Sequence, residues 1–231
     1  MTKAKAVQIS EQGSPDVIAW VDVDLPPPGP GEVRMRNTVV GLNFIDTYHR
    51  GGVYKVKLPS GLGVEAAGVV EEVGEGVADF RVGDRVCTFG LAVGAYATAR
   101  NIAASLLFHV PDDISDEIAA ASILKGCTTE FLVERCAKVE AGWSVLVHAA
   151  AGGVGLLLVQ WLKKLGAIVI GTVSTREKAE LARAAGADHI IDYSHEDVGA
   201  KCRELTGGAG VRVVFDGVGQ DTWEASLKSA G

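Results

Sequence analysis

HAAAGGVG, residues 148–155, joins two apolar runs and decides how the surrounding chain folds. Aligned as Ala150-x-Gly152-x-x-Gly155, it keeps the second and third glycines of the dinucleotide fingerprint G-x-G-x-x-G, with alanine in place of the first. The second glycine lets the backbone approach a pyrophosphate, and the third lets a helix pack closely on a strand. The pattern favours a dinucleotide-binding loop, and the alternative is an ordinary strand-to-helix turn.

From about residue 123 onward, the segments around this loop alternate between strand-like and helix-like patterns. We predict strands over residues 143–148, 167–173, 188–192 and 211–215, and helices over residues 153–165, 175–185, 195–206 and 221–229. Such alternation is typical of βαβ units in a parallel sheet. Doubly wound dinucleotide domains commonly have about six strands, so we expect the C-terminal part of the sheet to be missing from this sequence.

The first part of the chain follows a different pattern, in which glycine-containing turns separate short apolar runs. The runs lie at residues 7–9, 18–20, 33–39, 69–73 and 86–89. This spacing of short strands favours a barrel or sandwich over a parallel sheet. We therefore predict a β-rich domain over residues 1–122 and a dinucleotide-binding domain over residues 123–231.

The composition argues against several classes of partner. The chain has 231 residues and a formal net charge of −7, which gives no electrostatic footprint for nucleic acid or for an anionic membrane. Residues 141–162 carry no charge, but glycines, His148 and Gln160 interrupt them. We expect these residues to form a buried strand, turn and helix rather than a membrane span. The expected partner is a small molecule.

The cysteines point to a reducing compartment. Cys87, Cys127, Cys136 and Cys202 form no C-x-x-C pattern, so we expect buried thiols rather than a zinc site or a disulfide framework. The N-terminal stretch MTKAKAVQISEQG lacks the apolar core of a signal peptide. Together these features predict a cytoplasmic protein.

The end of the second strand predicted in the βαβ series bears on the choice of cofactor. An NAD site has an acidic residue there for the ribose hydroxyls, whereas this chain has Ser174 and Thr175, followed by Arg176 and Lys178. Cations in the first turn of a helix oppose the helix dipole, and a bound 2′-phosphate would explain them. We therefore predict NADP(H) rather than NAD(H). The alternative is that both cations are solvated surface charges.

Several motifs occur in the order typical of one family. They are GLNFIDTYHRGGVY (residues 41–54), LPSGLGVEAAGVVEEVGEGV (58–77), GDRV (83–86), LKGCTT (124–129) and HAAAGGVGLLLVQWLKKLGA (148–167). Over the whole chain they resemble the zinc-free quinone oxidoreductases, the zeta-crystallin-like branch of the medium-chain dehydrogenase/reductase superfamily. The resemblance implies a GroES-like N-terminal domain, a Rossmann domain, NADPH as cofactor, and a homodimer or larger homo-oligomer.

The chain departs from the zinc alcohol dehydrogenases of that superfamily at the metal positions. Where those enzymes have C-x-H-D this chain reads NFID, residues 43–46, and where they have Gly-His-Glu it reads GVE, residues 63–65. Neither cysteine nor histidine is present at the ligand positions, so a tetrahedral zinc site is not available. We expect no metal.

The resemblance also implies which side chains meet the cofactor and the acceptor. Asn43 and Thr128 would face the nicotinamide, Tyr48 and Tyr54 would line the acceptor cleft, and Lys125 would lie close to them. Further cofactor contacts are implied at Gly152, Gly153, Val154, Gly155, Ser174, Lys178, Tyr193 and Val218. Hydride transfer needs the acceptor held over the nicotinamide, and a quinone is already electrophilic, so neutral donors and one cation suffice.

Each candidate in the first domain or at the junction has a structural alternative. Asn43 can be the N-cap of a helix over residues 44–50, with Asp46 completing a capping box. We expect Asp46 and Arg50 to form an i,i+4 surface pair rather than a catalytic dyad. For Tyr48 and Tyr54 the alternative is aromatic packing in a loop. For Lys125 it is a solvated charge at the domain junction.

The expected activity is NADPH-dependent reduction of quinones without a catalytic metal. A second hypothesis is reduction of a C=C bond conjugated to a carbonyl, because the same hydride geometry serves it. A third is a non-catalytic NADPH-binding structural protein, as among lens crystallins of the family. Turnover separates the third hypothesis from the others, and comparison of a quinone with an enone separates the first two.

Overall fold

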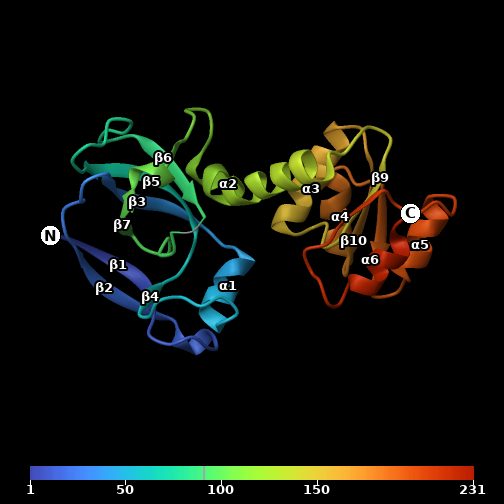
Figure 1. Cartoon of the computed structure of the whole chain (residues 1–231), viewed down its shortest axis with the longest axis horizontal. Coiled ribbons are helices and arrows are strands. Elements are labelled where there is room, and N and C mark those ends of the chain that lie inside the picture. Colours follow the sequence, from blue (N-terminus) through green and yellow to red (C-terminus); the bar gives the residue numbers. More distant parts are fainter. Residues whose placement is uncertain (91) are drawn as a thin grey trace. The chain divides into compact units, whose positions relative to one another are not determined.

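The computed structural model describes residues 1–90 and 92–231. Its contacts divide the chain into two compact units, Met1–Leu124 and Lys125–Gly231. The boundary between the units lies within helix α2 (Asp116–Glu130), which contributes residues to both (Figure 1).

The first unit is built from two antiparallel sheets. A five-stranded sheet has the order β7-β3-β5-β6-β8, and a three-stranded sheet has the order β2-β1-β4 (Figure 1). The strands are β1 (Thr2–Ile9), β2 (Ala19–Leu25), β3 (Glu32–Gly41), β4 (Ser60–Gly61), β5 (Glu65–Val73), β6 (Arg85–Phe89), β7 (Ala99–Ala103) and β8 (Phe108–His109). The helical segments are α1 (Phe44–Gly51) and the 3₁₀ turns η1 (Pro15–Val17) and η2 (Ala104–Leu106). The predicted β-rich character is confirmed, although β4, β7 and β8 were not predicted.

The core of the five-stranded sheet explains why its strands are apolar. Val33 and Met35 on β3 and Val70 on β5 pack in one buried cluster with Val86 and Ile102 from the neighbouring strands. Residues two apart on a strand point to the same face, so alternate positions enter this core. The alternation in the sequence therefore predicted β3, β5 and β6 correctly, but not β7.

Helix α2 was not predicted, because its apolar residues do not follow one clear face. It begins at Asp116, after Ser115, whose hydroxyl accepts a hydrogen bond from the amide of Ile118 at 3.3 Å. A turn of π-helix, η3 (Phe131–Ala137), continues it. Tertiary contacts, rather than an amphipathic pattern, stabilise this helix.

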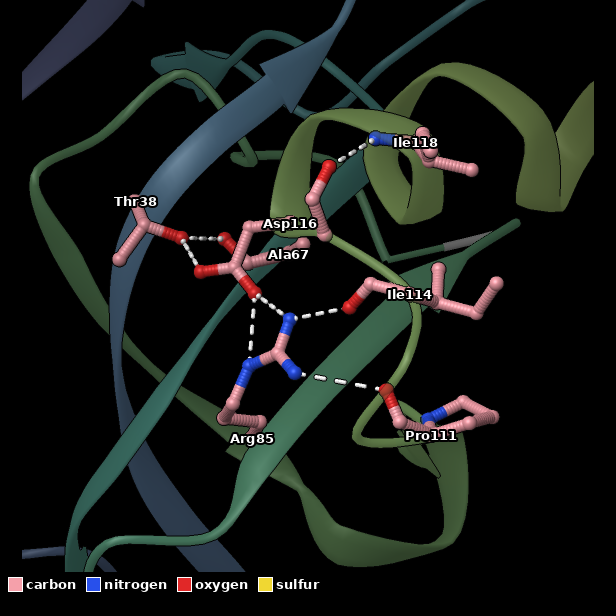
Figure 2. A network of polar contacts seen from close by, with 8 residues as sticks. Thr38, Ala67, Arg85, Pro111, Ile114, Asp116 and Ile118 are labelled. Atoms are coloured by element: carbon pink, nitrogen blue, oxygen red, sulfur yellow. Dashed lines mark hydrogen bonds and ion pairs between the residues drawn. The ribbon is translucent and has the colours of Figure 1, made fainter.

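A polar cluster holds the start of α2 on the five-stranded sheet (Figure 2). Arg85 on β6 donates from Nη2 to Asp116 Oδ1 at 2.6 Å and to the carbonyl of Ile114 at 2.6 Å. Thr38 on β3 donates to Asp116 Oδ2 at 2.6 Å. Burial alone would raise the pKa of Asp116, but the hydrogen bonds from Thr38 and Arg85 outweigh it and hold the pKa below its ordinary value.

We expect Asp116→Asn to lower the free energy of unfolding by about 1–2 kcal/mol at neutral pH, because a hydrogen bond to a charged group is lost at a partly exposed site. The folded-state pKa of Asp116 is depressed, so its contribution is present above the unfolded pKa of about 3.9 and is lost as the pH falls through the folded pKa. Urea unfolding over a pH series from 7 downward measures this. The difference between the two chains should be largest at pH 7 and should shrink as the pH falls below about 3.9, whereas the exposed Asp113→Asn control should match the parent throughout. A difference that stays constant over the whole series would contradict the electrostatic explanation.

The second unit contains a parallel sheet with the order β11-β10-β9-β12 (Figure 1). The strands are β9 (Ser144–Val147), β10 (Ile168–Val173), β11 (His189–Asp192) and β12 (Val213–Phe215). The helices are α3 (Gly153–Lys164), α4 (Arg176–Ala184), α5 (Val198–Leu205) and α6 (Trp223–Ser229). All four predicted strands and all four predicted helices are confirmed, with ends shifted by a few residues.

Both faces of this sheet are buried, which explains the unbroken apolar run before the glycine loop. Val145 and Val147 on β9 pack against Leu162 of α3 on one face. Leu146 packs with Cys202 of α5 on the other face. A parallel strand covered by helices on both sides reads as a continuous hydrophobic segment.

The uncharged residues 141–162 contain β9, the glycine turn and most of α3. Across residues 1–90 and 92–231, no helix combines the length and the apolar character needed to cross a bilayer.

Candidate functional site

The glycine loop forms a tight turn at the carboxyl end of β9. Ala149 lies in the left-handed region with φ 49°. The amide of Gly152 donates to the carbonyl of Ala149 at 2.8 Å, and Gly152 is the N-cap of α3. The first amides of a helix lack intrahelical acceptors and carry the positive end of its dipole. The start of a helix with such amides is where phosphates commonly bind, and a phosphate contact at α3 stays a prediction.

Ala150, at the first fingerprint position, packs against Gly171 on the neighbouring strand β10. Ala150 is fully buried, and its amide donates to the carbonyl of Thr172 at 3.1 Å. A Cβ at Gly171 of β10 would lie 2.7 Å from the Cβ of Ala150, so the methyl group fills the space that Gly171 leaves open. This explains how the loop keeps its shape without the first glycine.

Two cavities open at the carboxyl ends of the strands in this unit. One of about 450 Å³ lies between the ends of β9 and β12 and is lined by Gly152, Gly155 and Asp216 among others. The chain order reverses between these strands, and ligands of open α/β sheets bind at such a switch point. The other cavity, of about 460 Å³, shares His148 and Val218 with the first.

A third, smaller cavity of about 140 Å³ brings together four of the predicted cofactor residues, namely Gly152, Ser174, Lys178 and Tyr193. Lys178 Nζ donates to Ser174 Oγ at 3.2 Å. Arg176 instead pairs with Glu180 at 3.2 Å on an exposed face of α4. Lys178 thus lines a cavity beside the glycine loop, whereas Arg176 follows the surface alternative.

Two further candidates of the second unit lie beside the glycine loop. Thr128 of α2 lines the cavity between β9 and β12, together with Val154. A Cβ at Gly153 would lie 2.9 Å from Cδ and Cε of Lys125, so the lysine side chain runs along the start of α3. Their roles toward a nicotinamide and an acceptor stay predictions.

In the first unit, Asn43 has the cap position that its sequence context suggested. It is the N-cap of α1, and its amide N–H donates to Asp46 Oδ2 at 3.0 Å as part of a capping box with Asp46. Its side-chain amide donates to Glu65 Oε2 at 2.8 Å. Because a carboxylate only accepts, this bond points the NH₂ group of Asn43 at Glu65 and turns its carbonyl oxygen away.

The expected surface pair between Asp46 and Arg50 is wrong. Asp46 is only 4% exposed and accepts a hydrogen bond from the hydroxyl of Tyr96 at 2.5 Å. Arg50 donates to the carbonyl of Gly13 at 3.2 Å. The i,i+4 spacing is present, but Asp46 is buried and its carboxylate is bound by Tyr96, in the segment before β7, and by the amide of Asn43.

Glu65 and Tyr96 were missed at the sequence level. Burial, and then the neighbouring Asp46, raise the pKa of Tyr96 well above its ordinary value, so it stays a hydrogen-bond donor. Glu65 is fully buried at the first position of β5. A Cβ at Gly41 would lie 2.2 Å from Glu65 Oε2. Gly41 is the cross-strand partner of Glu65 and leaves room for this carboxylate, and in the sequence Glu65 stood out only as the last residue of the GVE stretch.

Tyr48 and Tyr54 come together in the first unit. Their ring centroids lie 5.5 Å apart in an edge-to-face contact, and Tyr48 makes a similar contact with Phe44 at 5.2 Å. Tyr54 is 49% exposed. Aromatic packing is therefore present, and contact of the same rings with an acceptor stays a prediction.

The zinc-ligand positions of the related alcohol dehydrogenases hold Asn43 and Val64, and Val64 is an apolar, buried side chain. Within the described part of the chain, no three His, Cys, Asp or Glu side chains are grouped so that they could hold a metal ion.

Comparison with known proteins places these features in one family. Residues 29–112 match the model described as alcohol dehydrogenase GroES-like domain, and residues 153–231 match the model described as zinc-binding dehydrogenase. A quinone oxidoreductase from Pseudomonas aeruginosa is 52% identical over 225 residues, which cover 97% of this chain and 69% of that protein. The chain belongs to the quinone oxidoreductase branch of the medium-chain dehydrogenase/reductase superfamily.

Two further members of the family bear on the chemistry. A 2-haloacrylate reductase from a Burkholderia species is 50% identical over 228 residues, which cover 96% of this chain and 68% of that protein. The crystal structure of Escherichia coli quinone oxidoreductase complexed with NADPH has a TM-score of 0.95 and 46% identity, with coverage of 98% of this chain and 70% of that one. The predicted fold, a GroES-like domain followed by a Rossmann domain, is confirmed for this quinone oxidoreductase family member.

Proposed function

We propose that this chain is an NADPH-dependent oxidoreductase that reduces quinones without a catalytic metal. The observation that carries the cofactor assignment is the small cavity in which Ser174, Lys178 and Tyr193 meet Gly152 of the glycine loop. It provides a cation, a hydroxyl and an aromatic ring next to the start of α3, which suits a phosphorylated ribose. Membership of the family, which includes an NADPH complex, supports the same cofactor.

When bound, NADPH supplies the hydride, and the protein binds and orients the reactants. The backbone at Gly152 would hold the pyrophosphate, and Lys178 with Ser174 would hold the 2′-phosphate. Asn43, whose side-chain amide is held by Glu65, would contact the nicotinamide. The hydroxyls of Tyr48 and Tyr54 would donate hydrogen bonds to the acceptor. Charge that develops on a quinone oxygen is stabilised by such donors, and no Lewis acid is needed.

A second activity is reduction of a C=C bond conjugated to a carbonyl group. The relative that carries the name 2-haloacrylate reductase, at 50% identity, favours this alternative. Oxidation of NADPH followed at 340 nm with 1,4-benzoquinone and with 2-cyclohexenone separates the two. Faster turnover with the quinone supports the proposal, faster turnover with the enone favours the alternative, and binding of NADPH without turnover favours a structural protein.

We expect Lys178→Ala to weaken NADPH binding by about 10- to 150-fold, which corresponds to the loss of a charge-assisted hydrogen bond of about 1.5–3 kcal/mol. The affinity for NADH should change little, because NADH has no 2′-phosphate. Arg176→Ala is the matched control, since Arg176 is in the same helix but pairs with Glu180. Fluorescence titration measures the affinities of the parent and of both variants for NADPH and for NADH. Equal losses for both cofactors would overturn the 2′-phosphate assignment.

Prolonged dialysis against a strong chelator should leave quinone reduction unchanged. The positions that carry zinc ligands in related dehydrogenases hold an amide and a valine, which do not form a tetrahedral Zn²⁺ site. The rate with NADPH and quinone is measured before and after dialysis, with and without added ZnCl₂. Activity that dialysis removes and only zinc restores would contradict this prediction.

The proposal extends to the assembly and the location of the protein. A homodimer or larger homo-oligomer rests on the family resemblance, and sedimentation equilibrium tests it. A cytoplasmic location rests on cysteines that form no C-x-x-C pattern. A small-molecule quinone or conjugated carbonyl is the proposed partner, with no role for nucleic acid or membrane.

A further inference from the structure

A buried polar network links the carboxyl ends of three strands to helix α6. His148, at the end of β9, lies 3.1 Å from Thr172 of β10 through Nδ1 and 3.1 Å from Ser226 of α6 through Nε2. Ser226 Oγ in turn donates to Asp216 Oδ2 at 2.6 Å. His148 and Ser226 are 5% and 7% exposed. None of these four residues was singled out as functional from the sequence.

Asp216 is the centre of this network. Its carboxylate accepts from Thr222 Oγ1 at 2.7 Å and from the amides of Val218 and Gly219 at 3.0 and 2.9 Å, in addition to Ser226. Burial alone would raise the pKa of Asp216, but these donors outweigh it and hold the pKa at about 2. The residue is therefore an ionised acceptor around which the segment 216–222 is wrapped.

The donor pattern fixes the tautomer of His148. An ionised carboxylate has no proton to give, so the single proton of Ser226 Oγ is directed at Asp216. Ser226 must then accept from His148, which places the imidazole proton on Nε2 and leaves Nδ1 to accept from the hydroxyl of Thr172. Burial lowers the pKa of His148 and outweighs the attraction of Asp216, so the ring is neutral.

The network determines what the cavities at the sheet edge present to a ligand. Both nitrogens of His148 are engaged, and the amides of Val218 and Gly219 point at Asp216. Val218 is half-exposed and lines both of the larger cavities, as does His148. The segment 217–219 therefore offers an apolar wall held in one position, not a set of hydrogen-bond donors.

We propose that Asp216, Ser226, Thr222 and neutral His148 are positioning residues, which fix the segment around Val218 as the shared wall of the cofactor cavities. This inference rests on the proposed function, because it assigns the cavities to the nicotinamide cofactor. A wall that is already in place when the cofactor arrives reduces the ordering cost of binding. The network holds a wall that would contact parts common to NADPH and NADH. Lys178, in contrast, would contact the 2′-phosphate, which only NADPH has.

The test compares two network variants with a matched control. Ser226→Ala removes the hydroxyl that links His148 to Asp216. Thr222→Val removes the hydroxyl that Thr222 donates to the carboxylate of Asp216 and keeps the shape of the side chain. If either change leaves the wall in place only about a tenth of the time, the affinities for NADPH and NADH both fall about tenfold. Thr222→Ser, which retains the hydroxyl, should restore binding.

Ser229→Ala is the control, because Ser229 is buried in the same helix, and its hydroxyl donates to the carbonyl of Ala225 at 2.7 Å and lies beside Cys202 of α5 rather than beside Asp216. Fluorescence titration measures the affinities, and circular dichroism confirms that each variant is folded. A nitrogen-15 spectrum of the imidazoles should show the Nε2-protonated tautomer of His148 in the parent and its loss in Ser226→Ala.

The outcomes separate this inference from the proposed function. Network variants that bind both cofactors within about twofold of the Ser229→Ala control would overturn the inference while the cofactor assignment stands. A loss that Thr222→Ser does not restore, or a His148 protonated on Nδ1 in the parent, would also overturn it. A parent chain that binds neither cofactor would overturn both.

Discussion

Gly152→Val should remain folded and bind NADPH about a thousandfold more weakly, equivalent to roughly 4 kcal/mol of binding free energy. Gly152 has φ −76° and ψ 170°, which a valine adopts without strain. The nearest atom to a Cβ at this position is the carbonyl oxygen of Ala149, at 3.1 Å. This contact is tight, so the carbonyl of Ala149 would have to shift by a few tenths of an ångström, but no atom within the folded chain lies closer than that. The requirement comes from a ligand whose phosphates approach the backbone, and two methyl groups would occupy that place.

The loss of a favourable N-cap residue should lower the stability of Gly152→Val by only about 1 kcal/mol. Ala150→Gly is the matched control in the same loop, because it removes a buried methyl group at a cost of about 1–2 kcal/mol and leaves the ligand side of the turn unchanged. Calorimetric titration with NADPH, accompanied by circular dichroism, measures both effects. Binding by Gly152→Val at the affinity of the parent would mean that the loop is only a turn.

Gly155→Ala should instead destabilise the second unit by about 3 kcal/mol, through overpacking that the backbone cannot relieve cheaply. A Cβ at Gly155 would lie 2.3 Å from the carbonyl oxygen of Ala149 and 2.9 Å from Cα of Ala150. Both contacts are with backbone atoms. Helix α3 would therefore have to move away from the end of β9, against the core formed by Val147 and Leu158.

Gly153→Ala provides the comparison for stability, since Gly153 lies in the same turn of α3. Its Cβ would meet Cδ and Cε of Lys125 at 2.9 Å, which belong to a flexible side chain rather than to the backbone. Alanine also has a higher helix propensity than glycine, by up to about 1 kcal/mol. Urea unfolding should therefore rank Gly153→Ala near the parent and Gly155→Ala far below it. Equal stabilities would show that the close packing at Gly155 does not limit the fold.

The two glycines show how far the motif alone could be interpreted. The fingerprint assigned an approach to the pyrophosphate to Gly152 and a packing role to Gly155, and the distances at each position agree with that division. The motif did not show why Ala150 is tolerated. That explanation needs Gly171, which lies on the adjacent strand and whose open space the methyl group of Ala150 fills.

Charged residues were less predictable than apolar ones. The spacing of Asp46 and Arg50 predicted a surface pair, whereas Asp46 is buried and bound by Tyr96, fifty residues away in the sequence. The spacing of residues along a helix predicts which side chains can contact each other, but not which face of the helix other segments bury. Whether a carboxylate is solvated depends on the strands packed over it, and those come from other parts of the chain.

The sequence by itself determined the four parallel strands, their helices and the glycine turn, because a strand buried on both faces and a helix-starting glycine loop are encoded by neighbouring residues. It also determined the cap at Asn43, which needs only a partner three residues away. Tertiary structure alone decided the Glu65–Asn43 bond and the network of His148, Ser226 and Asp216. His148 and Ser226 are 78 residues apart and meet because β9 ends and α6 begins at the same edge of the sheet. Polar partners of this kind leave no periodic signal, since one hydrogen bond constrains two distant positions and nothing between them.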